Sequence, residues 1–366
     1  MEHILFMKKK NTYIELLRFL FCVIIFVHHS GALTGEGDVA LLPNGAIAVE
    51  FFFIVSGFFA MAHIAKQETI EAPMCYSMKY TVDKLLKLLP YAAVSILTLY
   101  VLFATVLYEG TFDLASRLAT FKYLPYELTF TTMSGVMPVD LVYLKNTPLW
   151  FVSSMFIALP IVMYLSLKAK DLFKGYLMWF GPAMLFALIK LRYGQLFSWG
   201  LTHGVIFCGT VRALADITLG FAAFYVVKYL NEKLSSKIWA KILGTVLEVL
   251  LLLAVLNFTK VEHETYDQIL ITYAMFLMVS LALSNCTYFS LASRLNIAPV
   301  IDYLGSLAMP IYCLHWTVYV FAANLFPGSD YKKGMLICFI VTFAVAVVLK
   351  SAISGIKKLF ETKKAA

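Results

Sequence analysis

The sequence predicts an all-α protein, a polytopic membrane helix bundle of about ten transmembrane helices that forms a single domain over residues 1–366. The composition supports this first, because 61% of the residues are hydrophobic, only 14% are charged and the mean hydropathy is +0.81. So much apolar surface could not be hidden in one soluble core of this length. The apolar runs and the distribution of positive charge support the same fold class.

Ten apolar runs are long enough to cross a bilayer as helices, which takes about 20 residues each. They cover residues 13–32, 44–65, 88–108, 149–167, 175–189, 213–230, 242–259, 268–285, 300–324 and 334–355. The fifth run is short for a span. Residues 193–211 are apolar enough to be a rival span, so an eleventh helix is an alternative at that point.

Positive charge is distributed unevenly between the two ends of these runs. With the N-terminus inside, the cytoplasmic segments hold 20 Lys and Arg residues and the outer segments hold 9. This asymmetry satisfies the positive-inside rule and predicts that the N- and C-termini are both cytoplasmic. No small-residue cleavage site follows the first run, so we expect it to remain as a transmembrane helix.

The longest connection between runs, residues 109–148, lies outside in this topology. It carries four acidic residues, Glu109, Asp113, Glu127 and Asp140, among many aromatic residues. It either covers a site or lies at the membrane interface, and the sequence favours neither.

Nucleic acid and metal are not expected as partners. The formal net charge is +8, but no soluble segment combines an arginine-rich stretch with interleaved aromatic residues. The six cysteines form no CxxC pair and no Cys/His cluster with metal-binding spacing. We therefore expect buried free thiols and no metal site.

The first run contains ELLRFLFCVIIFVHHS, in which ionisable residues stand in an otherwise apolar helix. Such residues are costly in a bilayer and by default mark function. At 3.6 residues per turn, Arg18 and His29 share one helix face with Glu15, whereas His28 points to one side. The helix rises about 16 Å from Arg18 to His29, so Arg18 is predicted near the cytoplasmic side and His29 toward the outer side. Alternatively, Arg18 reaches the inner headgroups and His29 is satisfied by a neighbouring helix.

The second run contains AVEFFFIVSGFF, with Glu50 at about the depth of His29. A carboxylate and a histidine at one depth in adjacent helices form a plausible orienter and base, although a structural buried pair is the alternative. Ser56 and Gly57 predict a close contact between helices, the usual role of small residues in membranes.

The ninth run contains GSLAMPIYCLHWTVYVF, with His315 about halfway along it. His315 and Tyr312 could line the same cavity. Pro310 is predicted to kink the helix and to free a backbone carbonyl.

Two further features lie near the outer ends of the runs. Trp150 begins the fourth run, where an interfacial aromatic residue is the commoner case. Arg212 and Asp216, four residues apart at the start of the sixth run, are read as a pair.

These segments together resemble acyltransferase family 3 of integral membrane O-acyltransferases, in a stand-alone form without a fused extracytoplasmic esterase-like domain. IELLRFLFCVIIFVHHS is similar to the family's first-helix motif of a basic residue, ten intervening residues and a histidine, which Arg18 and His29 match. VEFFFIVSGFF, PLWFVSS and GSLAMPIYCLHW resemble its second-, fourth- and ninth-helix motifs, and KLLKLLPY matches the third in part. The fourth motif continues with Ser-Met-Phe where many members have acidic residues, and the Arg212 to Asp216 spacing is one residue off the usual pattern.

The resemblance implies that an acyl group, most simply acetyl, moves from cytoplasmic acyl-CoA to a hydroxyl of a cell-surface or lipid-linked glycan. The residues expected to take part are His29, Glu50 and His315 in catalysis, Arg18, Lys84 and Lys87 in donor binding, and Tyr312, Trp150 and Ser56 in substrate binding. The cations would bind the donor's phosphates. His29, oriented by Glu50, would deprotonate the acceptor or carry the acyl group.

The resemblance places the protein in the cell membrane, in contact with lipids. The alternative is a multi-pass transporter or exporter that uses an intramembrane Arg/His/Glu relay. Transporters often show internal repeats and paired broken helices. The sequence shows no repeat and one Pro-broken polar run, which favours the enzyme.

Overall fold

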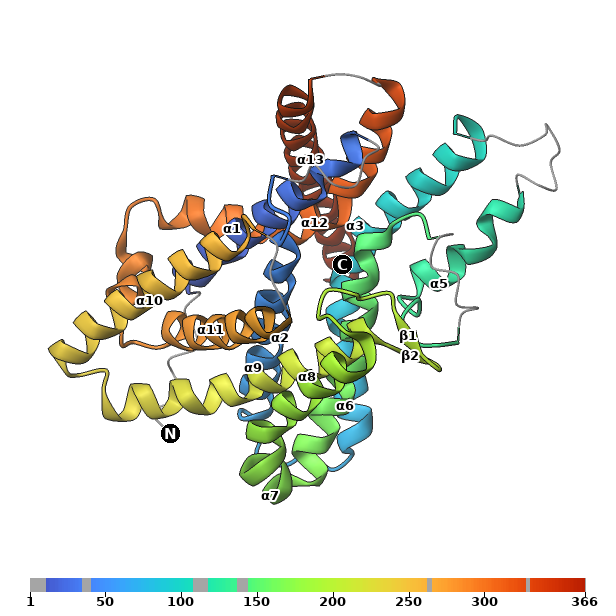
Figure 1. Cartoon of the computed structure of the whole chain (residues 1–366). Helices are drawn as coiled ribbons and strands as arrows, with labels where there is room; N and C mark the ends of the chain where they lie inside the picture. The colour runs from blue at the N-terminus through green and yellow to red at the C-terminus, as the bar shows by residue number, and fades with distance from the viewer. Residues whose placement is uncertain are drawn as a thin grey trace.

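The computed structural model describes residues 11–34, 41–107, 118–136, 144–261, 265–326 and 330–365, with side chains for all of these except 265 and 360–365. Within these ranges ten helices are long and apolar enough to cross a membrane, which confirms the predicted all-α, multi-pass membrane bundle (Figure 1). Glu109, Asp113 and Asp140 lie outside the described residues.

The spans follow one another along almost the whole chain. Their elements are α1 (Thr12–His28) with the 3-10 helix η2 (His29–Leu33), η3 (Gly45–Ile47) with α2 (Ala48–Ile64), α3 (Pro73–Thr105), η6 (Thr147–Leu149) with α6 (Trp150–Lys168), α7 (Lys170–Leu172) with the π-helix η7 (Phe173–Leu177) and α8 (Met178–Tyr193), α9 (Cys208–Lys233), α10 (Ile238–Phe258), α11 (Thr265–Leu283), α12 (Ala298–Leu325) and α13 (Tyr331–Ala365). The connections contain the short elements η4 (Thr120–Tyr123), α5 (Leu124–Leu128), β1 (Thr202–His203), β2 (Ile206–Phe207) and η8 (Tyr288–Arg294).

The structure decides against the rival span at residues 193–211. That segment contains the antiparallel hairpin of β1 and β2, in which Thr202 pairs with Phe207 and His203 with Ile206. A chain that turns back within a few residues cannot cross the hydrocarbon core. The count of ten spans therefore holds for the part of the chain that the structure describes.

The predicted start of the third helix, residue 88, is wrong. Helix α3 begins at Pro73, which stands in the first turn where a missing backbone N–H does no harm. The turns from Pro73 to Lys87 mix charged and apolar residues, so a search for a continuous apolar run does not include them. Lys84 and Lys87 consequently lie within this helix, several turns after its start.

Helix α2 is the most buried span, and its main partner is α9. A Cβ on Gly57 would collide with the carbonyl of Ile217, and one on Gly220 would collide with the carbonyl of Ile54. The two backbones can approach this closely because neither glycine has a side chain. The close helix contact predicted at Gly57 is confirmed.

Helix α1 lies along α12, the helix from the ninth predicted run. The Cys22 thiol donates to the carbonyl of Ala308 at 3.0 Å, and the Tyr319 hydroxyl donates to that of Phe26 at 3.0 Å. Helix α12 continues through Pro310 from its first to its last residue. These contacts bring together the two helices whose histidines the sequence singles out.

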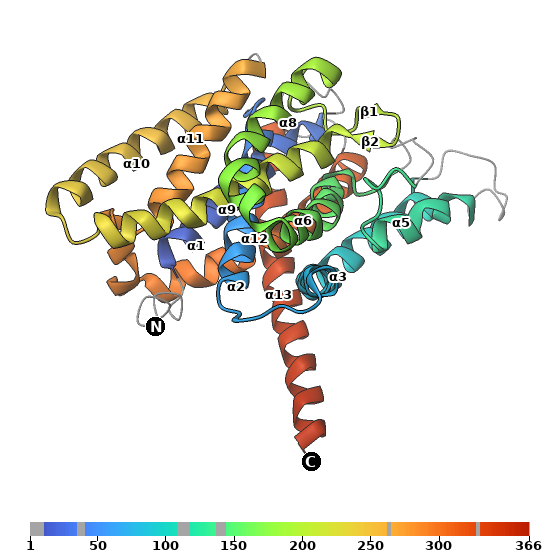
Figure 2. The same ribbon diagram turned by 90° about the horizontal axis from the view of Figure 1, so that it is seen from below.

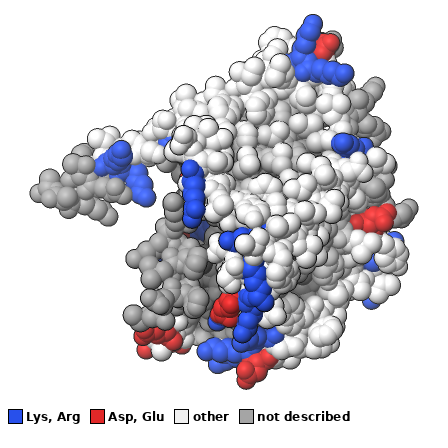
Figure 3. Space-filling view, turned by 90° about the vertical axis from the view of Figure 1, so that its left-hand side faces the viewer, with Lys and Arg blue, Asp and Glu red and all other residues white. Residues whose placement is uncertain are grey.

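Large apolar side chains cover much of the surface, as expected for a protein that faces lipid. In Figure 3 most of the visible face is neither basic nor acidic, and the charged side chains gather in a band from the middle of the face to its lower end and in smaller groups at its edges. Figure 2 shows the C-terminal part of α13 extending beyond the bundle. We name the two ends of the bundle by the residues of α1 near them, the Arg18 side and the His29 side.

Candidate active site

Two histidines from different helices meet near the His29 side. His29 begins η2, directly after α1, and His315 lies within α12. Nε2 of His315 is 3.1 Å from Nδ1 of His29, and the ring centroids are 5.0 Å apart. His315 is 1% exposed, whereas His29 is only partly buried. The ring of His28 packs edge-on against that of His29, with 5.1 Å between centroids, and its Nδ1 is 2.8 Å from the carbonyl of Leu42, so His28 is a neighbour of the pair with a packing and hydrogen-bonding role, as predicted.

The partners of the two rings fix where their protons lie. Nδ1 of His315 is 2.6 Å from the carbonyl of Tyr312, and a carbonyl only accepts, so this nitrogen carries the N–H. Nε2 of neutral His315 is then an acceptor, and Nδ1 of His29 donates to it and to the carbonyl of Ile25 at 3.1 Å. His29 therefore holds its proton on Nδ1 and keeps the lone pair of Nε2.

This arrangement suits His29 to proton transfer or nucleophilic attack. Its Nε2 can take a proton, and the resulting cation remains hydrogen-bonded through Nδ1 to the lone pair of His315. A hydrogen bond to a charged donor is stronger than one between neutral groups. The ring of Trp316 stands edge-on to the His29 ring at 5.8 Å and restricts its orientation.

A cavity of about 820 Å³ lies near the Arg18 side, between α1, α2, α3, α6 and α12. The residues that line it include four cations, Arg18, Lys79, Lys84 and Lys87, together with Asp83 and Ser56. The structure thus brings together the three cations predicted to bind the donor and adds Ser56 from α2. Such a cavity suits a large anionic ligand, because each cation can donate to phosphate oxygens.

Aromatic side chains form another part of the cavity wall. The ring of His63 stacks against Tyr76 at 5.7 Å and lies 4.8 Å from the ring of Tyr80. All three residues line the cavity. Flat rings beside cations are the groups that bind a nucleotide base and its phosphates.

Arg18 also forms an ion pair within its own helix. Its Nη1 lies 3.1 and 3.3 Å from the two carboxylate oxygens of Glu15, which confirms the shared helix face. The Arg18 side chain is 28% exposed, so this pair contributes at most about 1 kcal/mol to stability. The guanidinium is therefore held in the cavity wall without being sequestered.

Aromatic rings separate the cavity from the histidine pair. Phe151 lines the cavity, and its ring lies 5.7 Å from the ring of Tyr312. The Tyr312 ring is in turn 5.7 Å from the ring of His315, and its hydroxyl donates to the carbonyl of Pro148. The rings of Phe151 and Tyr312 thus stand in series between the cavity and His315.

The structure does not bring Glu50 to His29. Glu50 forms an ion pair with Arg212 of α9, and both side chains are fully buried. Asp216, the expected partner of Arg212, lies beside Glu50 in the same cluster. Helix α2 packs far more extensively on α9 than on α1, so its carboxylate faces the guanidinium instead of the histidines. Among the described residues, the partner that orients His29 is His315.

Trp150 stands over the same ion pair and is 6% exposed. The guanidinium of Arg212 lies 5.2 Å from its ring centroid, and Trp199 stacks on it at 5.6 Å with an angle of 7° between the planes. The ring is thus occupied by side chains of this chain and is not part of the cavity wall or the histidine pair.

Sequence reasoning did not find the aromatic part of the cavity. The signal was present, because Tyr76, Tyr80, Lys84 and Leu88 recur every fourth residue and therefore share one helix face. Asn146, which donates to the Cys313 carbonyl of α12, gave no comparable signal, and Trp316 stands beside His315 in the ninth-helix motif but was not singled out. Within the described ranges no three His, Cys, Asp or Glu side chains gather as a metal site requires.

Comparison with known families agrees with the resemblance noted in the sequence. The model of acyltransferase family 3, described as an acyltransferase domain, matches residues 11–353. No curated protein and no solved structure matches the chain.

Proposed function

The chain belongs to acyltransferase family 3 and is a multi-pass membrane acyltransferase, and we propose that it moves an acyl group from cytoplasmic acyl-CoA to a hydroxyl of a cell-surface or lipid-linked glycan. In the simplest case the acyl group is acetyl. The protein acts in the cell membrane. Arg18, Lys84 and Lys87 bind the donor, and His29 acts on the acceptor.

The observation that carries the proposal is the pairing of a cationic cavity with a histidine pair across the rings of Phe151 and Tyr312. The cavity is lined by Arg18, Lys84 and Lys87 near one side, and His29 with His315 stands toward the other. Acyl-CoA carries several phosphate charges and a base at one end and the thioester at the other. The cations and rings of the cavity suit the first end, and the layer formed by Phe151 and Tyr312 faces the thioester.

The reaction follows from the lone pair on Nε2 of His29. In one order of events Nε2 takes the proton of the acceptor hydroxyl while its oxygen attacks the thioester carbonyl. The carbon–sulfur bond then breaks, and the CoA thiolate leaves with the proton that His29 received. In the other order Nε2 attacks the thioester carbonyl, and the carbon–sulfur bond breaks to release the CoA thiolate and leave an acyl group on His29. The acceptor oxygen then attacks the acyl carbon, the carbon–nitrogen bond breaks, and the hydroxyl proton passes to the thiolate. Intact-protein mass spectrometry after incubation with donor alone distinguishes the two orders, because only the second leaves the acyl mass on the protein.

The test compares the wild type with His29→Ala at equal protein levels. Acyl groups on surface glycans are measured by mass spectrometry in cells that express each variant. The wild type should acylate a glycan, and His29→Ala should lose about 100-fold or more of that activity. His203→Ala, in the hairpin away from the histidine pair, is the matched control and should behave as wild type. Equal acylation by the wild type and His29→Ala would overturn the role of His29, and no glycan acylation by the wild type would overturn the proposed acceptor.

A further inference from the structure

Glu127, in the short helix α5 outside the spans, is a buried carboxylate to which the sequence assigns no role. It is 3% exposed, and its two oxygens accept three hydrogen bonds. Oε1 accepts from the Tyr100 hydroxyl at 2.9 Å and from the backbone N–H of Lys145 at 2.8 Å. Oε2 accepts from the backbone N–H of Asn146 at 3.0 Å. A buried carboxylate persists only where such partners replace water, so Glu127 fixes the start of the segment 145–148.

The segment 145–148 is attached on its other face to α12, close to His315. The indole N–H of Trp316 donates to the Lys145 carbonyl at 3.0 Å, and the amide of Asn146 donates to the Cys313 carbonyl at 3.3 Å. The Tyr312 hydroxyl donates to the carbonyl of Pro148. The residues immediately around His315 in sequence are thus tied to one short segment.

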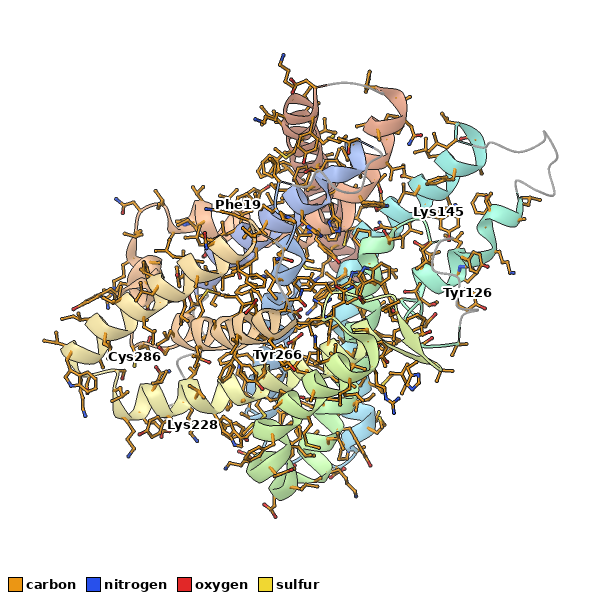
Figure 4. All side chains as sticks on the ribbon, viewed as in Figure 1. Phe19, Tyr126, Lys145, Lys228, Tyr266 and Cys286 are labelled. Carbon is orange, nitrogen blue, oxygen red and sulfur yellow. The ribbon has the colours of Figure 1, made fainter. Side chains whose placement is uncertain are left out.

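These same α12 residues contact the histidine pair. The carbonyl of Tyr312 accepts the N–H that fixes the tautomer of His315, and the ring of Trp316 stands edge-on to His29. A shift of the segment would therefore change the orientation of both rings. Figure 4 shows Lys145 and, on α5 next to Glu127, Tyr126 at the same end of the molecule.

We propose that Glu127 is a positioning residue for the His29–His315 pair, acting through the segment 145–148 and the residues Tyr312 and Trp316 that this segment holds. The inference rests on the proposed function for its effect on turnover, whereas its structural part is independent of the reaction. The short helix α5, which contains Glu127, is then part of the active-site support.

The structural part is tested by limited trypsin digestion of the full chain in detergent. Trypsin cleaves after lysine, and both the N–H and the carbonyl of Lys145 are hydrogen-bonded, so cleavage there should be slow. In Glu127→Gln the side-chain NH2 faces one of the backbone N–H groups, and cleavage after Lys145 should rise about tenfold. Tyr126→Phe is the matched control on the same helix and should leave cleavage unchanged. Unchanged cleavage in Glu127→Gln would overturn the inference.

The functional part is tested by steady-state kinetics per folded molecule. Glu127→Gln should lower kcat about tenfold through misplacement of the histidine rings. The KM for acyl-CoA should stay unchanged, because Glu127 does not line the donor cavity. A merely structural role would reduce the folded fraction and leave kcat per folded molecule intact, and that result would overturn the inference.

A second variant keeps the test decisive if Glu127→Gln does not accumulate. Trp316→Phe removes the donor to the Lys145 carbonyl and leaves the carboxylate in place. Like Glu127→Gln, it should raise cleavage after Lys145 and lower kcat. If neither change appears, the inference is overturned. If the wild type transfers no acyl group while the cleavage differences appear, the proposed function fails and the structural tie stands.

Discussion

The Glu50–Arg212 pair and the His29–His315 pair both lie inside the bundle, and they differ in charge and in burial. Glu50 and Arg212 are both fully buried, opposite in charge and covered by Trp150. In the histidine pair one ring is partly exposed, and Nε2 of His29 keeps a lone pair after every hydrogen bond is assigned. Burial of an ionisable group in a membrane is therefore a weak guide to chemistry, because the more deeply buried pair is the one whose charges are matched within the chain.

The largest expected effect comes from breaking the Glu50–Arg212 pair. Arg212→Leu leaves a buried carboxylate without its partner, and removal of one member of a buried pair costs about 3–5 kcal/mol. We expect the variant to accumulate poorly and to unfold at a clearly lower temperature in detergent. Thermal unfolding followed by the fluorescence of a thiol dye measures this, since five of the six cysteines are buried in the native protein.

Removal of the whole charge cluster sharpens the comparison. The triple variant Glu50→Leu, Arg212→Leu, Asp216→Asn leaves no unpaired charge and should recover most of the lost stability. Its activity per folded molecule should be close to that of the wild type. If the triple variant is well folded and inactive, Glu50 takes part in catalysis as the second-helix motif suggests, and the distinction between the two pairs fails.

The next largest effect is expected at His315, where stability should change little and turnover should change much. His315→Phe removes one of the two acceptors of the Nδ1 proton of His29 and leaves the Ile25 carbonyl. A hydrogen bond to a charged group contributes about 1.5–3 kcal/mol. We expect kcat to fall between about 10-fold and about 100-fold. His315→Gln retains an oxygen that can accept this proton and should keep more activity than His315→Phe. Equal activity of the two variants would show that His29 needs no acceptor at this position.

A smaller effect is expected in the cavity lined by Arg18 and Lys84. Unlike the fully buried charges of Glu50 and Arg212, these cations face a cavity. Arg18→Gln and Lys84→Gln each remove one charge-assisted contact and should raise the KM for acyl-CoA about tenfold with little change in kcat. Lys237→Gln, outside the cavity, is the matched control and should leave the KM unchanged. If Arg18→Gln and Lys237→Gln behave alike, the cations do not bind the donor.

The sequence predicts the helices better than it predicts which polar groups meet. Ten apolar runs follow from the length a bilayer demands, and the shared face of Glu15 and Arg18 follows from helix geometry alone. The partner of Glu50 could not be predicted, because depth in the membrane does not say which neighbouring helix a side chain faces. The contact between Gly57 and Gly220 decides that question, and it joins helices far apart in the sequence.

The role of Glu127 in positioning the histidine pair could not be predicted from the sequence either. Glu127 is one of several acidic residues in a connection with no periodic pattern, and its role depends on backbone N–H groups that any sequence would supply. Chemistry that resides in side chains at fixed spacing, such as Arg18 and His29, is visible in the sequence. Chemistry that depends on backbone partners requires the structure.

The smallest expected effect is a pH dependence at Glu127. Burial raises the pKa of the Glu127 carboxyl above its ordinary value, although the N–H groups of Lys145 and Asn146 and the Tyr100 hydroxyl oppose the shift. The native state therefore binds this proton more tightly than the unfolded state. Its contribution to stability is fully present below the ordinary pKa of about 4.3 and is lost as the pH rises through the raised value.

Stability and positioning should then change in opposite directions with pH. As the pH rises, the ionised Glu127 accepts all three hydrogen bonds and holds the segment 145–148, so cleavage after Lys145 should slow while the unfolding temperature falls slightly. Glu127→Gln cannot ionise, and the difference between its unfolding temperature and that of the wild type should vary as the pH rises above the ordinary carboxyl pKa of about 4.3. A difference that is constant over this range would mean that Glu127 keeps one protonation state throughout. Glu127 would then be a fixed structural group that does not respond to pH.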